Sequence, residues 1–222
     1  MSSLPAMKAC LFDLDGTLID SLEDLADAVN RMLVESGYPQ QPLSVFPKYI
    51  GDGAHKLVER ALPEEAREEG KIQLALQGYM RHYEDTWDKK SKPYPGMVEL
   101  LQDLRSRGYQ IGVLSNKPHD FTVKCCTHFF ASGTFDLVFG QRPHIARKPD
   151  PAGALETLHH FGCSPAEAYY LGDSGVDMQL ASNAGMYGVG VLWGFRGEEE
   201  LRENGAKRLI ASPEELLNQA AE

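Results

Sequence analysis

Short apolar runs alternate with segments of helical spacing over residues 98–220, and this alternation is the strongest constraint on the fold. Strands separated by helices of about ten to fifteen residues are typical of βαβ units and a parallel sheet. The expected helices are 98–108, 118–130, 151–161, 175–184, 198–204 and 213–220, and the expected strands are 110–114, 135–139, 168–171, 186–192 and 208–210. The sequence therefore predicts an α/β fold with a doubly wound parallel sheet.

The first strand, expected at 8–13, is separated from the others by a region that looks all-helical. Helices are expected from Asp20 or Ser21, either of which can cap the helix, to Gly37, at 54–62, and from Pro63 to Trp87 with a break near Gly70. No convincing strand is found between these helices. We therefore expect residues 1–19 and 92–222 to form the α/β core, and 20–91 to form a helical insertion.

Two aspartates follow the first strand directly, in Asp13-Leu14-Asp15-Gly16-Thr17. Carboxylates fit the carboxyl end of a strand better than its middle, and this edge of an open α/β sheet is where ligands bind. Because neighbouring carboxylates repel one another, they need a shared proton or a cation, and Mg²⁺ is one natural solution. Taken alone, the stretch is equally typical of a buried strand followed by an Asp-Gly turn.

Polar residues also follow three other expected strands, in Ser115-Asn116-Lys117, Lys148-Pro149-Asp150-Pro151 and Gly172-Asp173-Ser174 with Asp177. Each piece alone is typical of a turn, a loop or a helix cap. Together at one sheet edge they would combine carboxylates for a hard cation with a hydroxyl, an amide and an ammonium for a phosphate. This set predicts phosphoryl transfer with a carboxylate as nucleophile and a second carboxylate as general acid and base.

These four motifs, in this order, resemble those of the haloacid dehalogenase superfamily of phosphohydrolases, and the helical insertion resembles the family's C1 cap. The resemblance implies that Asp13 is the nucleophile and Asp15 the acid/base. It implies that Thr17, Ser115, Asn116 and Lys148 bind the phosphoryl group. It further implies a Mg²⁺ ion held by Asp13, by the backbone carbonyl of Asp15 and by Asp173, with Asp177 as an orienting carboxylate behind them.

Three further stretches, 51–62, 93–96 and 190–196, are similar to bacterial phosphoglycolate phosphatases. The resemblance implies hydrolysis of a small anionic metabolite, with 2-phosphoglycolate the best single choice. The cap turn usually reads Gly-Asn-Gly in those enzymes and reads Gly51-Asp52-Gly53 here, and a carboxylate facing an anionic substrate would be unfavourable. Pyrophosphate, a sugar or amino-sugar 6-phosphate, and a phosphosugar mutase reaction therefore stay open.

Residues of the insertion are candidates for contact with substrate, and solvation is the alternative for the charged ones. The candidates are Gly51, Asp52, Gly53, His55, Lys56 and Arg60. Tyr79, Tyr83 and Trp87 recur every four residues, which favours packing inside the cap or a dimer face over a substrate site.

Composition narrows the partners and the compartment. A net charge of −10 argues against a nonspecific nucleic-acid or membrane-surface binder. Met1–Lys8 lacks the features of a signal peptide, so a cytoplasmic protein is expected, as a monomer or homodimer. The four cysteines match no zinc or redox spacing and are expected to be reduced.

Two alternative functions are disfavoured by the motif residues. Asp15 argues against a dehalogenase, and retention of all the motif residues argues against a non-enzymatic scaffold.

Overall fold

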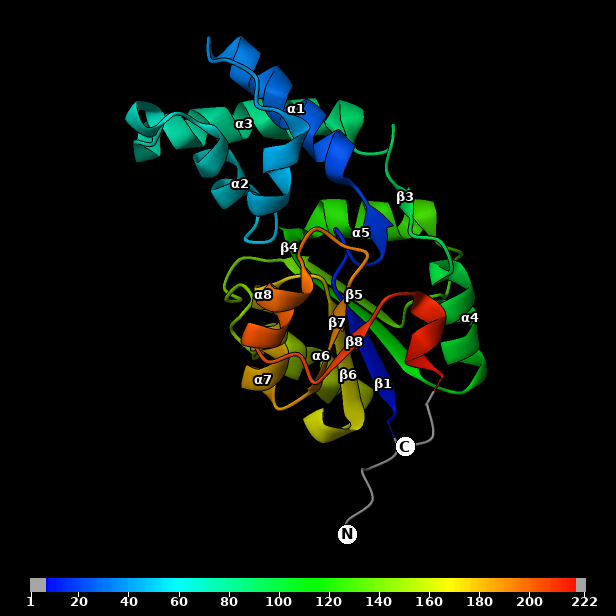
Figure 1. Ribbon diagram of the computed structural model, residues 1–222. Coiled ribbons are helices and arrows are strands. Elements are labelled where there is room, and N and C mark those ends of the chain that lie inside the picture. The colour runs from blue at the N-terminus through cyan, green and yellow to red at the C-terminus, as the bar shows by residue number, and fades with distance from the viewer. Residues whose placement is uncertain (1–6, 219–222) are drawn as a thin grey trace.

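Six parallel strands form the central sheet in the computed structural model, which describes residues 7–218 (Figure 1). They are β1 (Ala9–Phe12), β4 (Gln110–Pro118), β5 (Leu137–Gln141), β6 (Ala168–Gly172), β7 (Tyr187–Val191) and β8 (Arg208–Ile210). Their order across the sheet is β5-β4-β1-β6-β7-β8. The chain order thus runs in opposite directions on the two sides of β1, and a crevice opens at such a switch point, beyond the carboxyl ends of the strands.

Helices cover both faces of this sheet, as predicted. They are α4 (Met97–Ser106), α5 (His119–Phe129), α6 (Ala152–Phe161), α7 (Gly175–Ala184) and α8 (Glu198–Glu203). Alternate residues of β1 serve the two faces: Cys10 and Phe12 lie in one apolar cluster with α4 and α5, while Ala9 and Leu11 lie in another with α6 and α7. Burial on both sides explains why β1 reads as a continuous apolar run.

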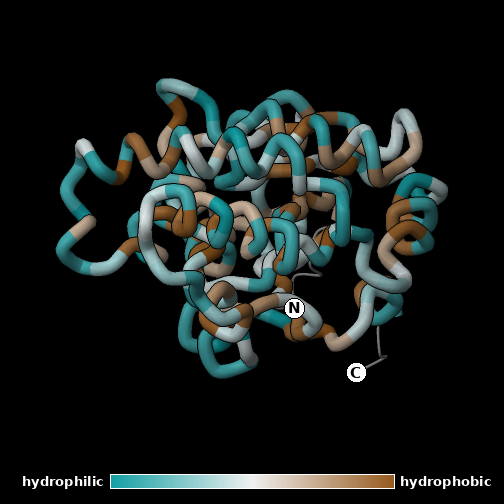
Figure 2. The backbone as a smooth tube through the Cα atoms, turned by 90° about the horizontal axis from the view of Figure 1, so that it is seen from above, coloured by the Kyte–Doolittle hydropathy of each residue, from teal (hydrophilic) through white to brown (hydrophobic). Residues whose placement is uncertain are grey.

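A helical region lies over the carboxyl edge of the sheet (Figure 1). It contains α1 (Leu22–Glu35), α2 (Ala54–Ala61), α3 (Glu69–Thr86) and the 3₁₀ turns η1 (Leu43–Lys48) and η2 (Glu64–Ala66). Viewed from above, hydrophobic and hydrophilic stretches alternate along the backbone (Figure 2), and one apolar cluster extends from α4 and α5 into α1, α2 and α3. Among residues 7–218, no helix combines the length and apolar character needed to cross a bilayer.

The two chain connections between this region and the core pair with each other. β2 (Ile19–Asp20) and β3 (Lys92–Pro93) form a two-stranded antiparallel sheet, which is too short to leave a periodic pattern in the sequence. Beside it, the buried carboxylate of Asp24 accepts hydrogen bonds from the backbone N–H groups of Lys90 and Ser91 and from the Ser91 hydroxyl. The entering and leaving segments are therefore held together.

Two helix predictions need correction. The third helix of the insertion begins at Glu69, not at Pro63, and Gly70 lies in its first turn, so it is not a break. The side chain of Arg67 donates hydrogen bonds to the carbonyls of Arg60 and Leu62, which holds the chain in a turn before α3. The helix expected at 213–220 is the 3₁₀ turn η4 (Pro213–Leu216), and residues 219–220 lie outside the described residues.

Candidate active site

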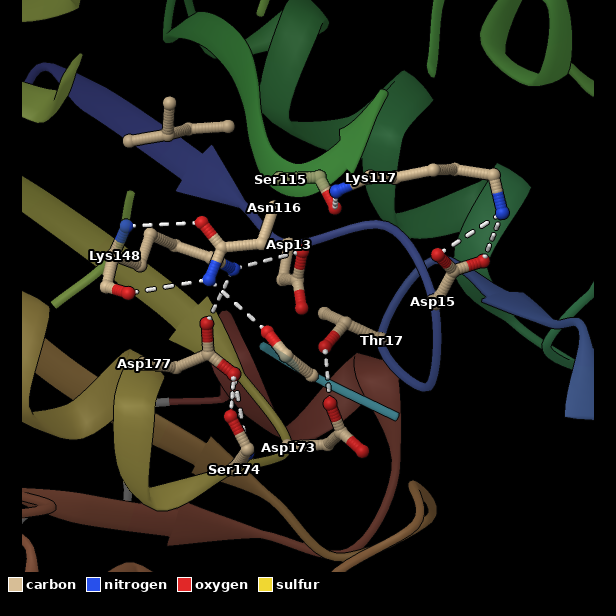
Figure 3. A network of polar contacts seen from close by, with 12 residues as sticks. Asp13, Asp15, Thr17, Ser115, Asn116, Lys117, Lys148, Asp173, Ser174 and Asp177 are labelled. Carbon is tan, nitrogen blue, oxygen red and sulfur yellow. Dashed lines mark hydrogen bonds and ion pairs between the residues drawn. The ribbon is translucent and has the colours of Figure 1, made fainter. Parts of the chain in front are cut away.

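The motif residues converge at the carboxyl ends of β1, β4 and β6 (Figure 3). Asp13 and Asp173 follow β1 and β6 directly, as predicted. Ser115 and its neighbours differ from the prediction, because β4 does not end at Leu114. The strand continues to Pro118 through an irregular stretch, since its pairing with β5 shifts register between Leu114 and Pro118. This irregularity turns Ser115 and Asn116 toward the site although they belong to a strand.

Lys148 is the cationic centre of the site. Its ammonium lies 2.9 Å from an oxygen of Asp13 and 2.7 Å from Asp177, and it is 3.2 Å from the Tyr170 hydroxyl. Asp177 is fixed in turn by the backbone N–H and the hydroxyl of Ser174, which caps α7. Asp177 therefore holds Lys148 in place, and Lys148 faces Asp13.

Three buried carboxylates meet beside this lysine. Oxygens of Asp13, Asp173 and Asp177 all lie within 4.8 Å of one another. Burial raises the pKa of Asp13 to about 6, against the opposing charge of Lys148. Burial, followed by the charges of Asp177 and Asp13, raises the pKa of Asp173 well above its usual range. Three ionised carboxylates beside one ammonium would carry excess negative charge, which burial makes unfavourable.

The donor set of this cluster fits a hard divalent cation. Carboxylate oxygens are the ligands that such ions prefer, and a bound cation would favour the charged carboxylates that burial disfavours. Within residues 7–218, Asp13 Oδ1 is buried and makes no hydrogen bond of good geometry, although Lys148 is near. An oxygen of this kind is free to bind an ion or a substrate.

Asp173 is closely packed against Gly16, Thr17 and Phe195. Its Oδ2 accepts a hydrogen bond of 2.7 Å from the backbone N–H of Phe195, and the Thr17 hydroxyl lies 3.4 Å from its Oδ1. Gly16 has a φ of +82°, and a Cβ there would lie 2.3 Å from Asp173 Oδ2. Only glycine allows this approach. Thr17, expected at the phosphate, is thus placed against Asp173.

Asn116 joins three parts of the site through its side-chain amide. Its Oδ1 accepts from the backbone N–H of Lys148, and its Nδ2 donates to the carbonyls of Lys148 and Gly51. The last bond, of 3.0 Å, connects the core to the turn of the helical insertion. The amide therefore positions the Lys148 loop as well as the insertion above it.

The carboxylate of Asp15 lies apart from the three-carboxylate cluster and points toward Lys117 (Figure 3). Lys117 Nζ is 2.8 and 3.0 Å from the two Asp15 oxygens, and it donates a further bond of 2.6 Å to the hydroxyl of Tyr83. Although burial opposes it, the charge of Asp15 raises the pKa of Lys117. Ser21 donates to Asp15 as well, at 2.6 Å, and its hydroxyl makes no bond to the helix that it precedes.

Sequence reasoning gave no role to Lys117 or Tyr83. Lys117 stands directly after the Ser-Asn pair, and this adjacency was the one available signal for it. The spacing of Tyr83 favours packing inside the cap or at a dimer face. Tyr83 is buried, with its ring stacked on Tyr79, but its hydroxyl accepts a hydrogen bond from Lys117 of the core. No periodicity along α3 could reveal a partner on β4.

A small cavity of about 40 Å³ lies between the core residues and the helical insertion. Asp13, Asp15, Ser115 and Lys117 line it from the core. The insertion contributes an apolar wall and the glycines of its turn, namely Leu25, Ile50, Gly51, Gly53, Ala54, Leu57 and Tyr79. Within residues 7–218, Lys117 is the only cationic residue of this lining.

Only two of the six candidate residues of the insertion, Gly51 and Gly53, line this cavity. The other four have partners elsewhere among the described residues. Asp52 pairs with Arg60 at 2.5 Å, Lys56 with Glu59 at 2.5 Å, and His55 with Glu69 at 3.3 Å. The extra carboxylate of the turn is thus directed toward Arg60.

The chain is also similar to known proteins. Residues 10–191 match the family described as "Haloacid dehalogenase-like hydrolase". The chain belongs to this family. A phosphoglycolate phosphatase of Aquifex aeolicus is 35% identical over 189 residues, which cover 85% of this chain and 86% of that protein. One from Nitrosococcus oceani is 33% identical over 217 residues, covering 95% and 96%.

Solved structures extend the similarity to the whole fold. A crystal structure of a predicted phosphoglycolate phosphatase from Haemophilus somnus has a TM-score of 0.87 and 27% identity, covering 95% of this chain and 96% of that one. These findings confirm the predicted family, the doubly wound α/β fold and the class of enzyme: the protein is a phosphoric monoester hydrolase. The acidic cluster can hold the divalent metal that phosphatases of this family generally use.

Proposed function

We propose that the protein is a Mg²⁺-dependent phosphatase that acts through a phosphorylated Asp13 and hydrolyses 2-phosphoglycolate to glycolate and phosphate. The observation that carries the proposal is the pairing of a buried Asp13 with Lys148 at 2.9 Å, inside a cluster of three carboxylates. A nucleophilic carboxylate beside a fixed ammonium can attack a phosphorus atom whose oxygens the ammonium holds.

In the first half of the proposed reaction, the phosphoryl group moves to the enzyme. An oxygen of Asp13 attacks phosphorus and the bond from phosphorus to the substrate oxygen breaks. Asp15, which carries a proton on one oxygen at this stage, gives that proton to the leaving oxygen. Lys148 and Ser115 would hold the phosphoryl oxygens, and both side chains are buried. The alcohol leaves, and Asp13 carries an acyl phosphate.

In the second half, water attacks the phosphorus of this acyl phosphate. Asp15, now ionised, takes the proton of the attacking water, and the bond from phosphorus to Asp13 breaks. Phosphate leaves and both carboxyl groups return to their starting states. The net change consumes one water for each ester bond hydrolysed.

Asp13, Asp173 and the backbone carbonyl of Asp15 are the proposed Mg²⁺ ligands. When bound, the ion would neutralise phosphoryl charge, which is the main requirement of this chemistry. Asp177 is engaged by Lys148 and Ser174, and we assign it the task of orienting Lys148. The segment 20–91 is proposed to act as the cap, and 1–19 with 92–222 as the catalytic core.

The choice of substrate rests on the cavity and on the relatives. The cavity lies between the core and the insertion, and a leaving group as short as glycolate needs less of this space than a hexose does. Its cap wall is apolar, and the carboxylate of Asp52 is directed toward Arg60, which removes one objection to an anionic substrate. The names of the relatives from Aquifex aeolicus and Nitrosococcus oceani support the same substrate.

A phosphate-release screen tests this proposal. The purified protein with Mg²⁺ is given 2-phosphoglycolate, pyrophosphate, glucose 6-phosphate and an amino-sugar 6-phosphate, and the substrates are ranked by kcat/KM. The expected result is that 2-phosphoglycolate ranks first and that Asp13→Asn releases no phosphate from it. Preference for a sugar phosphate would overturn the substrate assignment, and formation of an isomerised phosphosugar would indicate a mutase.

A further inference from the structure

Lys117 lies at the junction of three parts of the molecule. It comes from the irregular end of β4, its ammonium binds both oxygens of Asp15, and its remaining donor bonds the hydroxyl of Tyr83 on α3 of the helical insertion. The ammonium also lies 4.7 Å from the centre of the Tyr83 ring. All three N–H donors of the lysine therefore have partners, and those partners belong to two different regions of the fold.

The environment of Lys117 leaves it no freedom to move. Its side chain is 4% exposed, and Tyr83 is 1% exposed, between the ring of Tyr79 and that of Phe121. A buried ammonium with three short bonds is held much more rigidly than a surface lysine, since breaking any one bond leaves a buried donor unsatisfied. The position of Asp15 is thereby coupled to the packing of α3.

We propose that Lys117, held by Tyr83, is a positioning residue for Asp15: it sets where the acid/base carboxylate lies relative to the leaving oxygen. This inference rests on the proposed function, which makes Asp15 the proton donor. Lys117 itself exchanges no proton and forms no bond in the reaction. Ser21 completes the arrangement by holding Asp15 from the start of α1.

The need for a fixed Asp15 follows from the geometry of proton transfer. The donor must lie within about 3 Å of the leaving oxygen as the bond to phosphorus breaks, and a displacement of about 1 Å can cost about a hundredfold in rate. Without Lys117, Asp15 would keep the bond from Ser21 alone among the described side chains. The carboxylate could then rotate away from the cavity.

The test compares two small substrates whose leaving groups differ in their need for a proton. 2-Phosphoglycolate, or the best alkyl phosphate of the screen above, leaves as an alkoxide and needs one; acetyl phosphate leaves as acetate and does not. Because kcat/KM reports only the steps up to the first irreversible one, it isolates the first half of the reaction. For Lys117→Met we expect kcat/KM to fall at least about tenfold for the alkyl phosphate and to change less than about threefold for acetyl phosphate.

Two further variants keep the test decisive if Lys117→Met folds poorly. Tyr83→Phe removes only the hydroxyl and keeps the ring. It should also lower kcat/KM for the alkyl phosphate more than for acetyl phosphate, but by a smaller factor than Lys117→Met. In an Asp15→Asn background, Lys117→Met should add nothing to the loss for the alkyl phosphate, because the group that it positions is already gone.

A matched control is available on the same interface. Lys124 of α5 pairs with Glu84 of α3, and its ammonium lies near the ring of Trp87. Lys124→Met therefore removes a contact between core and insertion that lies outside the cavity. It should leave kcat/KM unchanged for both substrates.

The outcomes separate the two proposals. If Lys117→Met and Tyr83→Phe lower kcat/KM equally for both substrates, or for neither, the positioning role is wrong. The same holds if Lys124→Met reproduces the selective loss. If the unmodified protein with Mg²⁺ releases phosphate from neither substrate, the proposed function itself fails.

Discussion

The two sides of the cavity differ in chemistry: the core contributes charged and polar groups, and the helical insertion contributes a mostly apolar wall. On the core side, Asp13 lines the cavity, and behind it the buried Lys148 lies 2.9 Å from Asp13 and 2.7 Å from Asp177. On the side of the insertion, the wall consists of aliphatic side chains, Tyr79 and the backbone of a glycine turn, and the charged residues of α2 pair away from the cavity. The core therefore supplies the groups that can react, and the insertion supplies the surface that limits the size and shape of the bound molecule.

This difference explains why a reaction is easier to assign here than a substrate. Buried ion pairs cost several kcal/mol when one partner is removed, so their geometry is strongly determined. Partly exposed pairs such as that between Asp52 and Arg60 are worth about 0–1 kcal/mol, so they constrain the positions of their side chains much less. The predictions below test the contrast, beginning with the residue that should matter most.

Asp13→Asn should have the largest effect. The amide cannot attack phosphorus, so we expect kcat to fall to the background of the assay. Phosphate release measured with the best substrate of the screen checks this. Circular dichroism of the variant is the control, since a folded protein without activity locates the loss in the chemistry. Steady-state turnover by folded Asp13→Asn would contradict covalent attack.

Removal of the metal should be almost as severe and, unlike a substitution, reversible. Excess EDTA is expected to abolish phosphate release, because no cation would then neutralise the charge of a phosphoryl group beside the three carboxylates. Adding Mg²⁺ beyond the EDTA should restore the rate. Full activity after exhaustive chelation would show that these carboxylates serve another purpose.

Gly53→Ala should produce an intermediate effect. Gly53 has a φ of +86°, and a Cβ there would lie 3.0 Å from the carbonyl oxygen of Asn116, so the turn must shift. Strain of this kind costs about 1–3 kcal/mol, which would correspond to roughly a five- to hundredfold loss in kcat/KM if the turn contacts substrate. Gly70→Ala, at a glycine in α3 with open space around it, is the control. Equal behaviour of the two variants would argue against a role for the turn.

Asp52→Asn should have the smallest effect, although it restores the Gly-Asn-Gly turn of similar enzymes. The carboxylate is paired with Arg60 and does not line the cavity, so we expect kcat/KM to change by less than about twofold and stability by less than about 1 kcal/mol. Kinetics and thermal unfolding measure the two quantities. A large gain in kcat/KM would mean that Asp52 faces the substrate after all.

The features that sequence could predict share a physical cause. Strand ends in a parallel sheet meet at one edge, so Asp13, Ser115, Lys148 and Asp173 could be assigned to one site from the order of elements alone. Strong periodicity likewise gave the position of each core strand to within a few residues. The alternation of strands and helices along the sequence is enough to locate the strand ends, so the site could be predicted without knowing how side chains pack.

The features that sequence could not predict depend on contacts between distant elements. The partnership of Lys117 with Tyr83 joins β4 to α3, and neither residue breaks the pattern of its own element. The β2–β3 pair is only two residues long on each side. For the insertion, residue type gave six candidates, and only the packing of the folded chain decides that Gly51 and Gly53 line the cavity while the charged candidates pair elsewhere.

The central claim is that the core carries the phosphoryl group on Asp13 during turnover. Its most direct test is to quench the working enzyme in acid with substrate and Mg²⁺ present, digest it, and locate the phosphoryl group by mass spectrometry. The account predicts a phosphorylated peptide whose modified residue is Asp13 and which is missing when Asp13→Asn is treated in the same way. A phosphoryl group on another residue of the working enzyme would contradict it.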